Sequence, residues 1–289
     1  MTDLTNYPNG VTSFGVPLVG GGVPTVKGKY WWANSSSTSN KNDGKSKDTA
    51  FLTIQAAIDK AVDGDAILVA PGQYDETLLV DKSVTIVGLG GRGAAFVEPD
   101  TAGAEGMKVT ANDVTLVNLG VAGESTSDYA LNLNSAKRFR AYECKIEGPD
   151  DIIVLVDGTA TSQTADALFK DCEFAWGGKA MIFDDSLYGY PTQIFVQECR
   201  FHNIVTHMFG VNPSGLVNDL HVTNSMFANQ EDNTAPTDYI LLSSNSNTGI
   251  FAGNTFATAT NATGVLTIGT GIMWGPNGTE AGWSTARPA

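Results

Sequence analysis

Three pairs of adjacent carboxylates are the residues in this 289-residue chain best suited to acid–base chemistry. They are Asp150–Asp151, Asp184–Asp185 and Glu231–Asp232. Two acids on one wall of a groove can hydrolyse a glycosidic bond, one as general acid and the other as base or nucleophile. Adjacent residues on a strand point to opposite faces, so such a pair can cooperate only from a bend. We interpret the pairs as solvated turn residues and keep hydrolysis by Asp184 and Asp185 as the alternative.

Two glycine motifs and three histidines offer weaker chemistry. The segment Gly88-Leu-Gly-Gly-Arg-Gly93 has the spacing of a dinucleotide fingerprint, but residues 94–100 do not continue as the required helix. Gly44-Lys-Ser46 lacks the earlier glycine of a phosphate loop. The histidines lie beside apolar strand positions, where the outer face is expected: His202, His207 and His221. We therefore expect no cofactor, no metal and no catalytic residue.

The elements that must position these residues follow from a repeat of about 27 residues. Its frame is apolar, polar, apolar, a two-residue gap, then apolar, polar, apolar. Strict alternation on both sides of the gap is typical of strands, and the gap indicates a bend. The inward positions are Val114, Leu116, Leu119, Val121; Phe139, Ala141, Cys144, Ile146; Ala167, Phe169, Cys172, Phe174; Ile194, Val196, Cys199, Phe201; Leu220, Val222, Ser225, Phe227; and Gly249, Phe251, Asn254, Phe256, after a partial copy at Val84, Ile86, Leu89. Constant strands with variable loops predict an all-β fold, a single parallel β-helix in which equivalent side chains stack into ladders.

Two of these ladders give the candidate core. Cys144, Cys172 and Cys199 share one inward position, and neighbouring Cβ atoms about 4.8 Å apart are too distant for a relaxed disulfide. We predict reduced, buried thiols without a catalytic role, because burial in apolar surroundings raises a thiol pKa. The second ladder is aromatic and comprises Phe174, Phe201, Phe227 and Phe256.

The flanking segments divide the chain into three parts. Residues 1–30 are interpreted as an extended arm, too apolar for a solvated tail, which should lie either on the body of its own chain or on a neighbouring molecule. Its candidate docking residues are Tyr7, Pro8, Asn9, Gly10, Val11, Phe14, Val16 and Leu18. Residues 31–270 form the β-helix, and within them 51–62 has helical periodicity and is expected to cap the first coil. Residues 271–289 are assigned to a C-terminal tail or cap.

The net charge argues against nucleic acid as a partner, and the apolar pattern of the chain argues against an export signal or a membrane span. A formal net charge of -14 disfavours nucleic acid, which normally requires clustered Lys and Arg. The first residues have neither the basic nor the apolar region of a signal peptide, and no apolar run approaches about 20 residues. We expect neither an export signal nor a membrane span, and folding in a reducing cytoplasm.

The entry to the repeat resembles that of pectin-lyase-like right-handed β-helices. The residues that carry the resemblance are Asp43 to Phe51, Thr53-Ile-Gln-Ala-Ala-Ile58 and Gly64-Asp-Ala-Ile-Leu-Val-Ala-Pro-Gly-Gln-Tyr74. The resemblance implies a right-handed β-helix with a capping helix. The working motifs of the enzyme members, such as Gly-His-Gly, Arg-Ile-Lys and Gly-Tyr-Gln-Asp-Thr, are absent. The fold also serves non-enzymatic viral proteins, so it does not define the function.

The arm, from Leu4 to Pro17, is similar to the N-terminal segment of structural proteins of tailed bacteriophages. This resemblance implies a non-enzymatic virion protein, a capsid decoration or stabilising protein that docks through its arm on the major capsid protein or other virion proteins, as a homotrimer. The expected location is the virion, assembled in the bacterial cytoplasm. The alternative is a tail-spike-like enzyme that degrades host surface glycans, or a tail protein that binds them with Trp176, Tyr188 or Tyr190.

Overall fold

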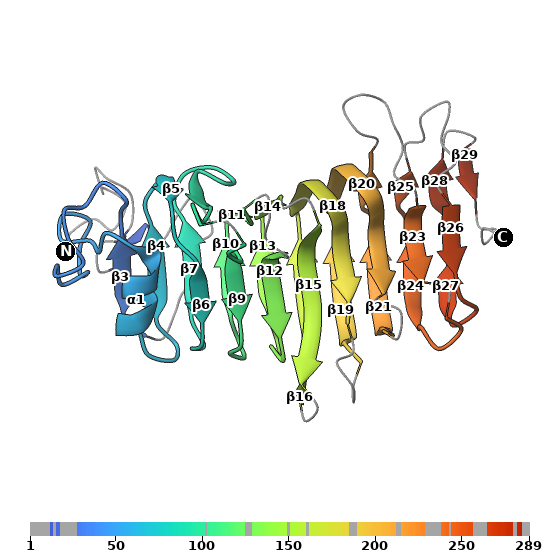
Figure 1. Ribbon diagram of the computed structural model, residues 1–289, viewed down its shortest axis with the longest axis horizontal. Helices are drawn as coiled ribbons and strands as arrows, with labels where there is room; N and C mark the ends of the chain where they lie inside the picture. The colour runs from blue at the N-terminus through green and yellow to red at the C-terminus, as the bar shows by residue number, and fades with distance from the viewer. Residues whose placement is uncertain are drawn as a thin grey trace, which may run out of the picture.

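The computed structural model is a single right-handed parallel β-helix, a rod of stacked coils with α1 and β3 at one end and β27 to β29 at the other (Figure 1). It describes residues 12–13, 16–17, 28–101, 103–124, 129–148, 151–159, 162–184, 190–211, 215–228, 238–242, 244–256, 265–279 and 282–284. The fold expected from the repeat is therefore confirmed. Of the arm, the structure describes the short antiparallel pair β1 (Thr12–Ser13) and β2 (Val16–Pro17) and residues 28–30. All proposed docking residues except Val16 lie outside the described residues.

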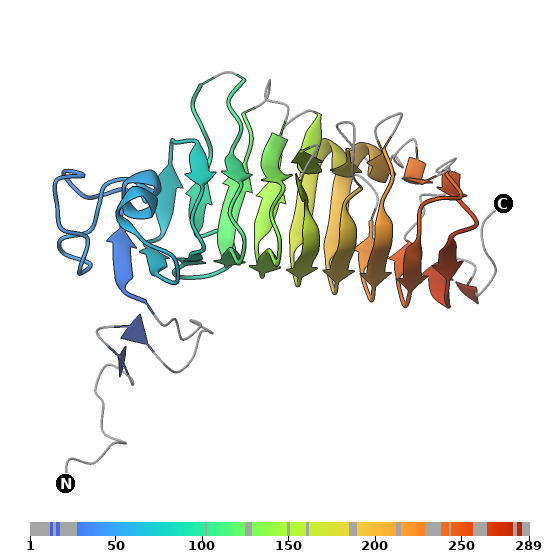
Figure 2. The same cartoon turned by 90° about the horizontal axis from the view of Figure 1, so that it is seen from below.

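Two sheets run the length of the rod, and Figure 2 shows their strands side by side from coil to coil. The ten-stranded sheet comprises β3 (Tyr30–Ala33), β4 (Ala66–Val69), β7 (Thr85–Gly88), β10 (Thr115–Val117), β13 (Arg140–Tyr142), β17 (Ala165–Lys170), β19 (Thr192–Gln197), β21 (Asn218–Thr223), β24 (Gly249–Ala252) and β27 (Ile272–Trp274). The other sheet has seventeen strands: β5 (Gly72–Tyr74), β6 (Leu78–Val80), β8 (Ala95–Val97), β9 (Met107–Val109), β11 (Leu119–Ala122), β12 (Tyr129–Asn134), β14 (Lys145–Glu147), β15 (Ile152–Thr159), β16 (Ser162–Gln163), β18 (Glu173–Phe183), β20 (Arg200–Val211), β22 (Met226–Phe227), β23 (Asp238–Leu242), β25 (Thr255–Phe256), β26 (Val265–Ile268), β28 (Asn277–Thr279) and β29 (Gly282–Ser284).

The bend between the sheets lies at the two-residue gap of the repeat. One residue of the gap has a positive φ in coil after coil: Asn118, Glu143, Asp171, Glu198, Asn224 and Gly253. A left-handed residue turns the chain sharply while the flanking strands stay in register with their neighbours. This bend lets four alternating apolar residues all point into the same interior.

The interior contains the predicted ladders. Parallel pairing sets Phe174 against Phe201, Phe201 against Phe227, and Phe227 against Phe256. Their rings stack with centroids 4.6, 5.0 and 4.7 Å apart. The ladder of Cys144, Cys172 and Cys199 is buried and the three thiols are free. One inward assignment is wrong: Leu89 is half-buried and packs on the outer face, whereas Ala95 pairs with Leu119 inside. The loop between β7 and β8 displaces the second half of that coil along the sequence.

The two ends of the rod differ in part from the expected boundaries. Helix α1 (Ile54–Lys60) is shorter than the expected 51–62, because the Thr53 side chain caps its start and Ala61 is already extended. The Glu76 carboxylate accepts hydrogen bonds from two backbone N–H groups of its first turn, at 2.6 and 2.9 Å. At the other end β27 pairs with β24, so the coil pattern continues beyond residue 270. No helix among the described residues is long and apolar enough to span a membrane.

Candidate functional site

Charged side chains gather on the outer face of β14, β18 and β20, around Glu173. His202 Nε2 lies 2.9 Å from Glu173 Oε1, and Arg92 Nη1 lies 3.7 Å from Glu173 Oε2. On β14, Lys145 Nζ lies 2.5 Å from Glu147 Oε2. The contact between Glu173 and His202 joins neighbouring coils, in which Glu173 pairs with Arg200 and His202 pairs with Ala175. Lys145 and Glu147 lie two residues apart on the same strand. The residues that alternate with this polar cluster along the strands point into the core and are apolar.

The electrostatics of the cluster favour an ionised Glu173. Burial alone would raise the pKa of its carboxyl. The hydrogen bond with His202 and the surrounding positive charges outweigh burial, and the pKa is lowered. A carboxylate of low pKa accepts hydrogen bonds or pairs with cations, but it is a poor general acid at neutral pH.

Beside this cluster Trp176 is 49% exposed and has a φ of 59°. Gly148 in the preceding coil and Asn203 in the following one also have positive φ. Glycine and asparagine adopt this conformation readily, whereas a bulky side chain is strained there. The strand register also shifts between Gly177 and Lys179. An exposed indole held in a strained bend beside charged groups is a suitable platform for stacking a sugar ring.

The other candidate glycan residues are only partly described. Tyr190 is 37% exposed, and Tyr188 lies outside the described residues. Of the acid pairs, Asp150, Asp185, Glu231 and Asp232 also lie outside them. Asp151 is described, and its Oδ1 lies 2.6 Å from Lys179 Nζ. The expectation that Asp184 and Asp185 act together therefore stays a prediction.

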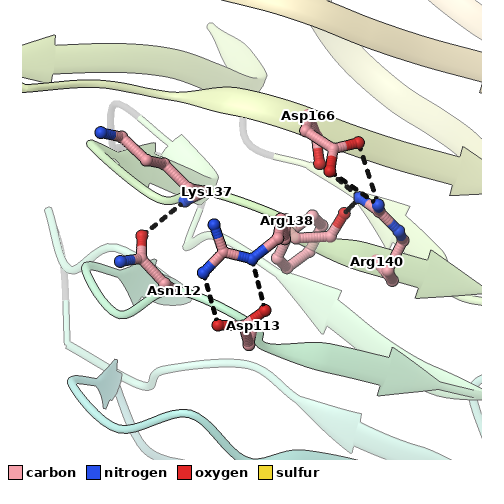
Figure 3. A network of polar contacts seen from close by, with 7 residues as sticks. Asn112, Asp113, Lys137, Arg138, Arg140 and Asp166 are labelled. Atoms are coloured by element: carbon pink, nitrogen blue, oxygen red, sulfur yellow. Dashed lines mark hydrogen bonds and ion pairs between the residues drawn. The ribbon is translucent and has the colours of Figure 1, made fainter.

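A second charged row follows the opposite edge of the ten-stranded sheet, where Asp113, Arg138 and Asp166 share a positive φ (Figure 3). Arg138 binds Asp113 through two hydrogen bonds of 2.6 and 2.7 Å. Arg140 Nη2 binds both carboxylate oxygens of Asp166, at 2.9 and 3.0 Å. The hydrogen bonds and charge of Arg138 lower the pKa of Asp113. These carboxylates tie neighbouring coils together.

The histidines occupy three different environments. His202 joins the cluster around Glu173. His221 Nε2 lies 2.6 Å from Asp219 Oδ1, and its ring packs on Phe195 with centroids 5.0 Å apart. His207, which was expected at an outward position, is buried, at 8% exposure. Its neighbour in the next coil is Asp238, and in the preceding coil Lys179.

The cysteines have the properties of core residues. Burial raises the pKa of Cys144 and of Cys199. Their Sγ atoms donate weak hydrogen bonds to backbone carbonyls, such as Cys144 to Tyr142 and Cys199 to Gln197. Within the described ranges, no group of three or more His, Cys, Asp or Glu residues is arranged to hold a metal ion.

Sequence reasoning named Trp176 as a candidate stacking residue but missed the charged side chains around it. The stacking of Lys145, Glu173 and Arg200 could have been read from the repeat frame, because each follows an aligned cysteine. Arg92 could not, since it comes from the glycine-rich loop whose path the repeat does not fix. The left-handed conformation of Trp176 could not be predicted either, because tryptophan does not favour a positive φ.

Comparison with known proteins agrees with the fold. The chain has the pectin-lyase-like parallel β-helix fold, which it shares with a pectin methylesterase from Aspergillus niger at a TM-score of 0.61 and 16% identity, over 93% of this chain and 91% of that one. An alginate lyase from Paenibacillus sp. str. FPU-7 is 13% identical at a TM-score of 0.58, over 86% and 96%. A rhamnogalacturonan lyase is 10% identical at a TM-score of 0.56, over 81% and 69%. At such low identity the likeness defines the fold alone.

Sequence relatives add little to this. No protein-family model matches the chain. A cell surface glycoprotein of Methanothermus fervidus is 31% identical over 103 residues, which are 35% of this chain. The match spans only 16% of the length of that glycoprotein.

Proposed function

We propose that this chain is a non-enzymatic structural protein of a bacteriophage virion that decorates or stabilises the capsid. Its N-terminal segment binds the major capsid protein or another virion protein, and the β-helix projects as a rigid body. The resemblance of residues 4–17 to phage structural proteins supports this proposal. The use of outer carboxylates in ion pairs between coils also favours a structural role over a catalytic one.

The observation that carries the proposal is the anchor where the N-terminal segment enters the rod. Asp65, 2% exposed, accepts hydrogen bonds from Lys29 N at 2.7 Å and from Trp31 Nε1 at 2.8 Å. Gly28 N donates to Gly64 O at 3.0 Å, and a Cβ at Gly28 would lie 2.3 Å from Asp65 Oδ1. Because these hydrogen bonds fix the start of the first coil, a force on the N-terminal segment is transmitted to the β-helix, as a docking segment requires.

Deleting residues 1–20 tests the docking role. We expect the truncated protein to lose binding to purified particles assembled without this chain, while its circular dichroism and melting temperature stay unchanged. Trp176→Ala serves as the control, because this residue is far along the chain from the anchor and should bind particles normally. Binding by the truncated protein equal to that of the full chain would refute the proposal.

The second candidate function is glycan binding or cleavage, and the exposed, strained Trp176 beside the Glu173 cluster favours it. The test uses oligosaccharides of polygalacturonate and alginate, chosen because enzymes of this fold act on pectin and alginate. Saturable binding that disappears in Trp176→Ala supports glycan binding. Release of reducing ends that is lost in Asp185→Asn supports cleavage and replaces our first proposal.

A further inference from the structure

The formal charge is distributed unevenly along the chain. Residues 1–60 carry six lysines and four acidic residues, a formal charge of +2. Residues 61–289 carry eleven basic and twenty-seven acidic residues, a formal charge of -16. Of the first part, β3 and α1 lie at one end of the rod (Figure 1). The acidic coils therefore repel an acidic partner, whereas this end can attract one.

Two cavities lie at this end of the rod and share Lys45. The first, of about 480 Å³, is lined by Gly28, Lys29, Tyr30, Trp31 and Lys45. The second, of about 500 Å³, lies on α1 and the loop before it, and its lining also includes Phe51 and Lys60. Each has the size of a typical ligand site. The two cavities bring cationic and aromatic side chains together.

Three lysines line these cavities, and we call Lys29, Lys45 and Lys60 the basic site. All three are exposed. Within the described ranges, Lys29 and Lys60 form no ion pair. Lys45 Nζ lies 3.8 Å from Asp43 Oδ2, a weak contact because both groups are exposed. Lys60 Nζ lies 6.0 Å from the centre of the Trp31 ring, a contact that does not neutralise its charge.

Basic side chains on the coils, by contrast, mostly pair with carboxylates of the same chain. The pairs include Arg92, Arg138, Arg140, Lys145, Lys170 and Lys179. At the rod end, Asp43 and Asp59 line the second cavity and accept hydrogen bonds from Lys45 N and Gln55 Nε2. The first cavity has two lysines and no acid among the described residues that line it. The basic site therefore offers positive charge that the chain itself does not neutralise.

We propose that the basic site binds an acidic segment of the virion protein on which the N-terminal segment docks. Carboxylates of the partner lie at the lysines, and its apolar atoms pack against the half-buried Tyr30. This inference rests on the docking proposal and adds the surface and the chemistry of the contact. The first residues of the chain itself do not match the site, because residues 1–27 hold one acid, Asp3, and one base, Lys27. A nucleic acid fits poorly too, because the acidic coils would repel so extended a polyanion.

The basic site lies where the N-terminal segment enters the rod. Gly28 and Lys29 line the first cavity, and Lys29 N is held by Asp65 Oδ1 at 2.7 Å. A partner that holds the N-terminal segment is therefore tethered within reach of the lysines. Two weak contacts with one partner reinforce each other, because the second forms at high effective concentration. The lysines also orient the rod, with the acidic coils away from an acidic shell surface.

Binding to particles assembled without this chain tests the proposal. The labelled full chain is titrated between about 0.1 and 1 M salt, a range over which the Debye length falls from about 10 to 3 Å. We expect the dissociation constant to rise with salt. At the lower salt concentration it should rise about tenfold or more in Lys29→Glu/Lys45→Glu/Lys60→Glu. The melting temperature should not change, because the three side chains are exposed.

The matched control is Lys108→Glu/Lys137→Glu/Lys170→Glu, which changes the net charge equally but lies on the coils. It should bind particles like the wild type. Charge reversal at the basic site that leaves binding unchanged, or weakens it no more than the control does, would overturn the inference. If deletion of residues 1–20 still abolishes binding in that case, the docking proposal stands and the basic site alone fails.

Two further outcomes count against the inference. Absence of particle binding by the full chain would refute both the docking proposal and the basic site. Charge reversal at the basic site could instead lower the melting temperature of the full chain but not that of the chain without residues 1–20. That result would show that the lysines hold the first residues of their own chain, and it would overturn the inference.

Discussion

Replacing Phe201 by alanine removes the central ring of the aromatic ladder. The ring is fully buried and stacks between Phe174 at 4.6 Å and Phe227 at 5.0 Å, with Phe209 tilted against it at 5.2 Å. Truncation of a buried Phe typically costs about 3–5 kcal/mol, depending on how far the surroundings can collapse into the cavity. Strand pairing on both sides fixes the spacing of the neighbouring coils, so little collapse is possible here. We therefore expect a loss near the upper end, about 4–5 kcal/mol.

Urea unfolding followed by circular dichroism measures this loss as a lower midpoint at an unchanged slope. Met226→Ala is the control, because Met226 precedes Phe227 in the adjacent strand but points outward. A surface substitution of this kind changes the free energy of unfolding by about 0.5 kcal/mol or less. A loss below about 1 kcal/mol in Phe201→Ala would refute the ladder register on which the description of the core depends.

Further predictions concern buried polar groups, titration and the thiols. Asn254→Ala should lower the free energy of unfolding by at least about 2 kcal/mol, because Asn254 bonds Ser225 N, Val222 O and Asn277 inside the rod, whereas exposed Ser246→Ala should have little effect in the same urea assay. The lowered pKa of Glu173 contributes stability above its ordinary pKa that is lost as pH falls through the folded value, so Glu173→Gln should flatten the acid side of a melting-temperature profile. Burial, only partly offset by backbone hydrogen bonds, raises the pKa of Glu76, so the stability that Glu76 contributes is lost as pH rises through its pKa in the folded state. The stability advantage of the wild type over Glu76→Gln should therefore shrink with rising pH. Parallel pH profiles of the two proteins would contradict this. The thiols of Cys144, Cys172 and Cys199 should react with an aromatic disulfide reagent only after unfolding. Fast reaction in the native protein would show that these thiols are not buried in the core.

The repeat predicted the fold well because side chains of equivalent coils must stack. An inward position tolerates few residue types, so Phe201 and Phe227 align in sequence as they do in space. Prediction failed where a loop of unusual length enters the frame. The six residues between β7 and β8 carry Leu89 to the outer face and put Ala95 in its place, which spacing alone could not reveal.

The surfaces were less predictable than the core. Outward positions are set by contacts with other coils, as in Arg138 and Asp113, which are 25 residues apart in sequence. Alternation predicted a polar outer face, whereas Phe195 and Ile250 are apolar at outward positions of the ten-stranded sheet. The sequence marked Trp176 as a candidate stacking residue but could not decide between that role and packing. Its strained backbone depends on the bend that it shares with Gly148 and Asn203.

A cryo-electron microscopy reconstruction of particles carrying the full chain tests the account most directly. We expect the β-helix of each copy to project from the capsid shell, with its N-terminal segment bound to the shell. Rods that contact the shell through their coils, with the N-terminal segment unattached, would contradict it.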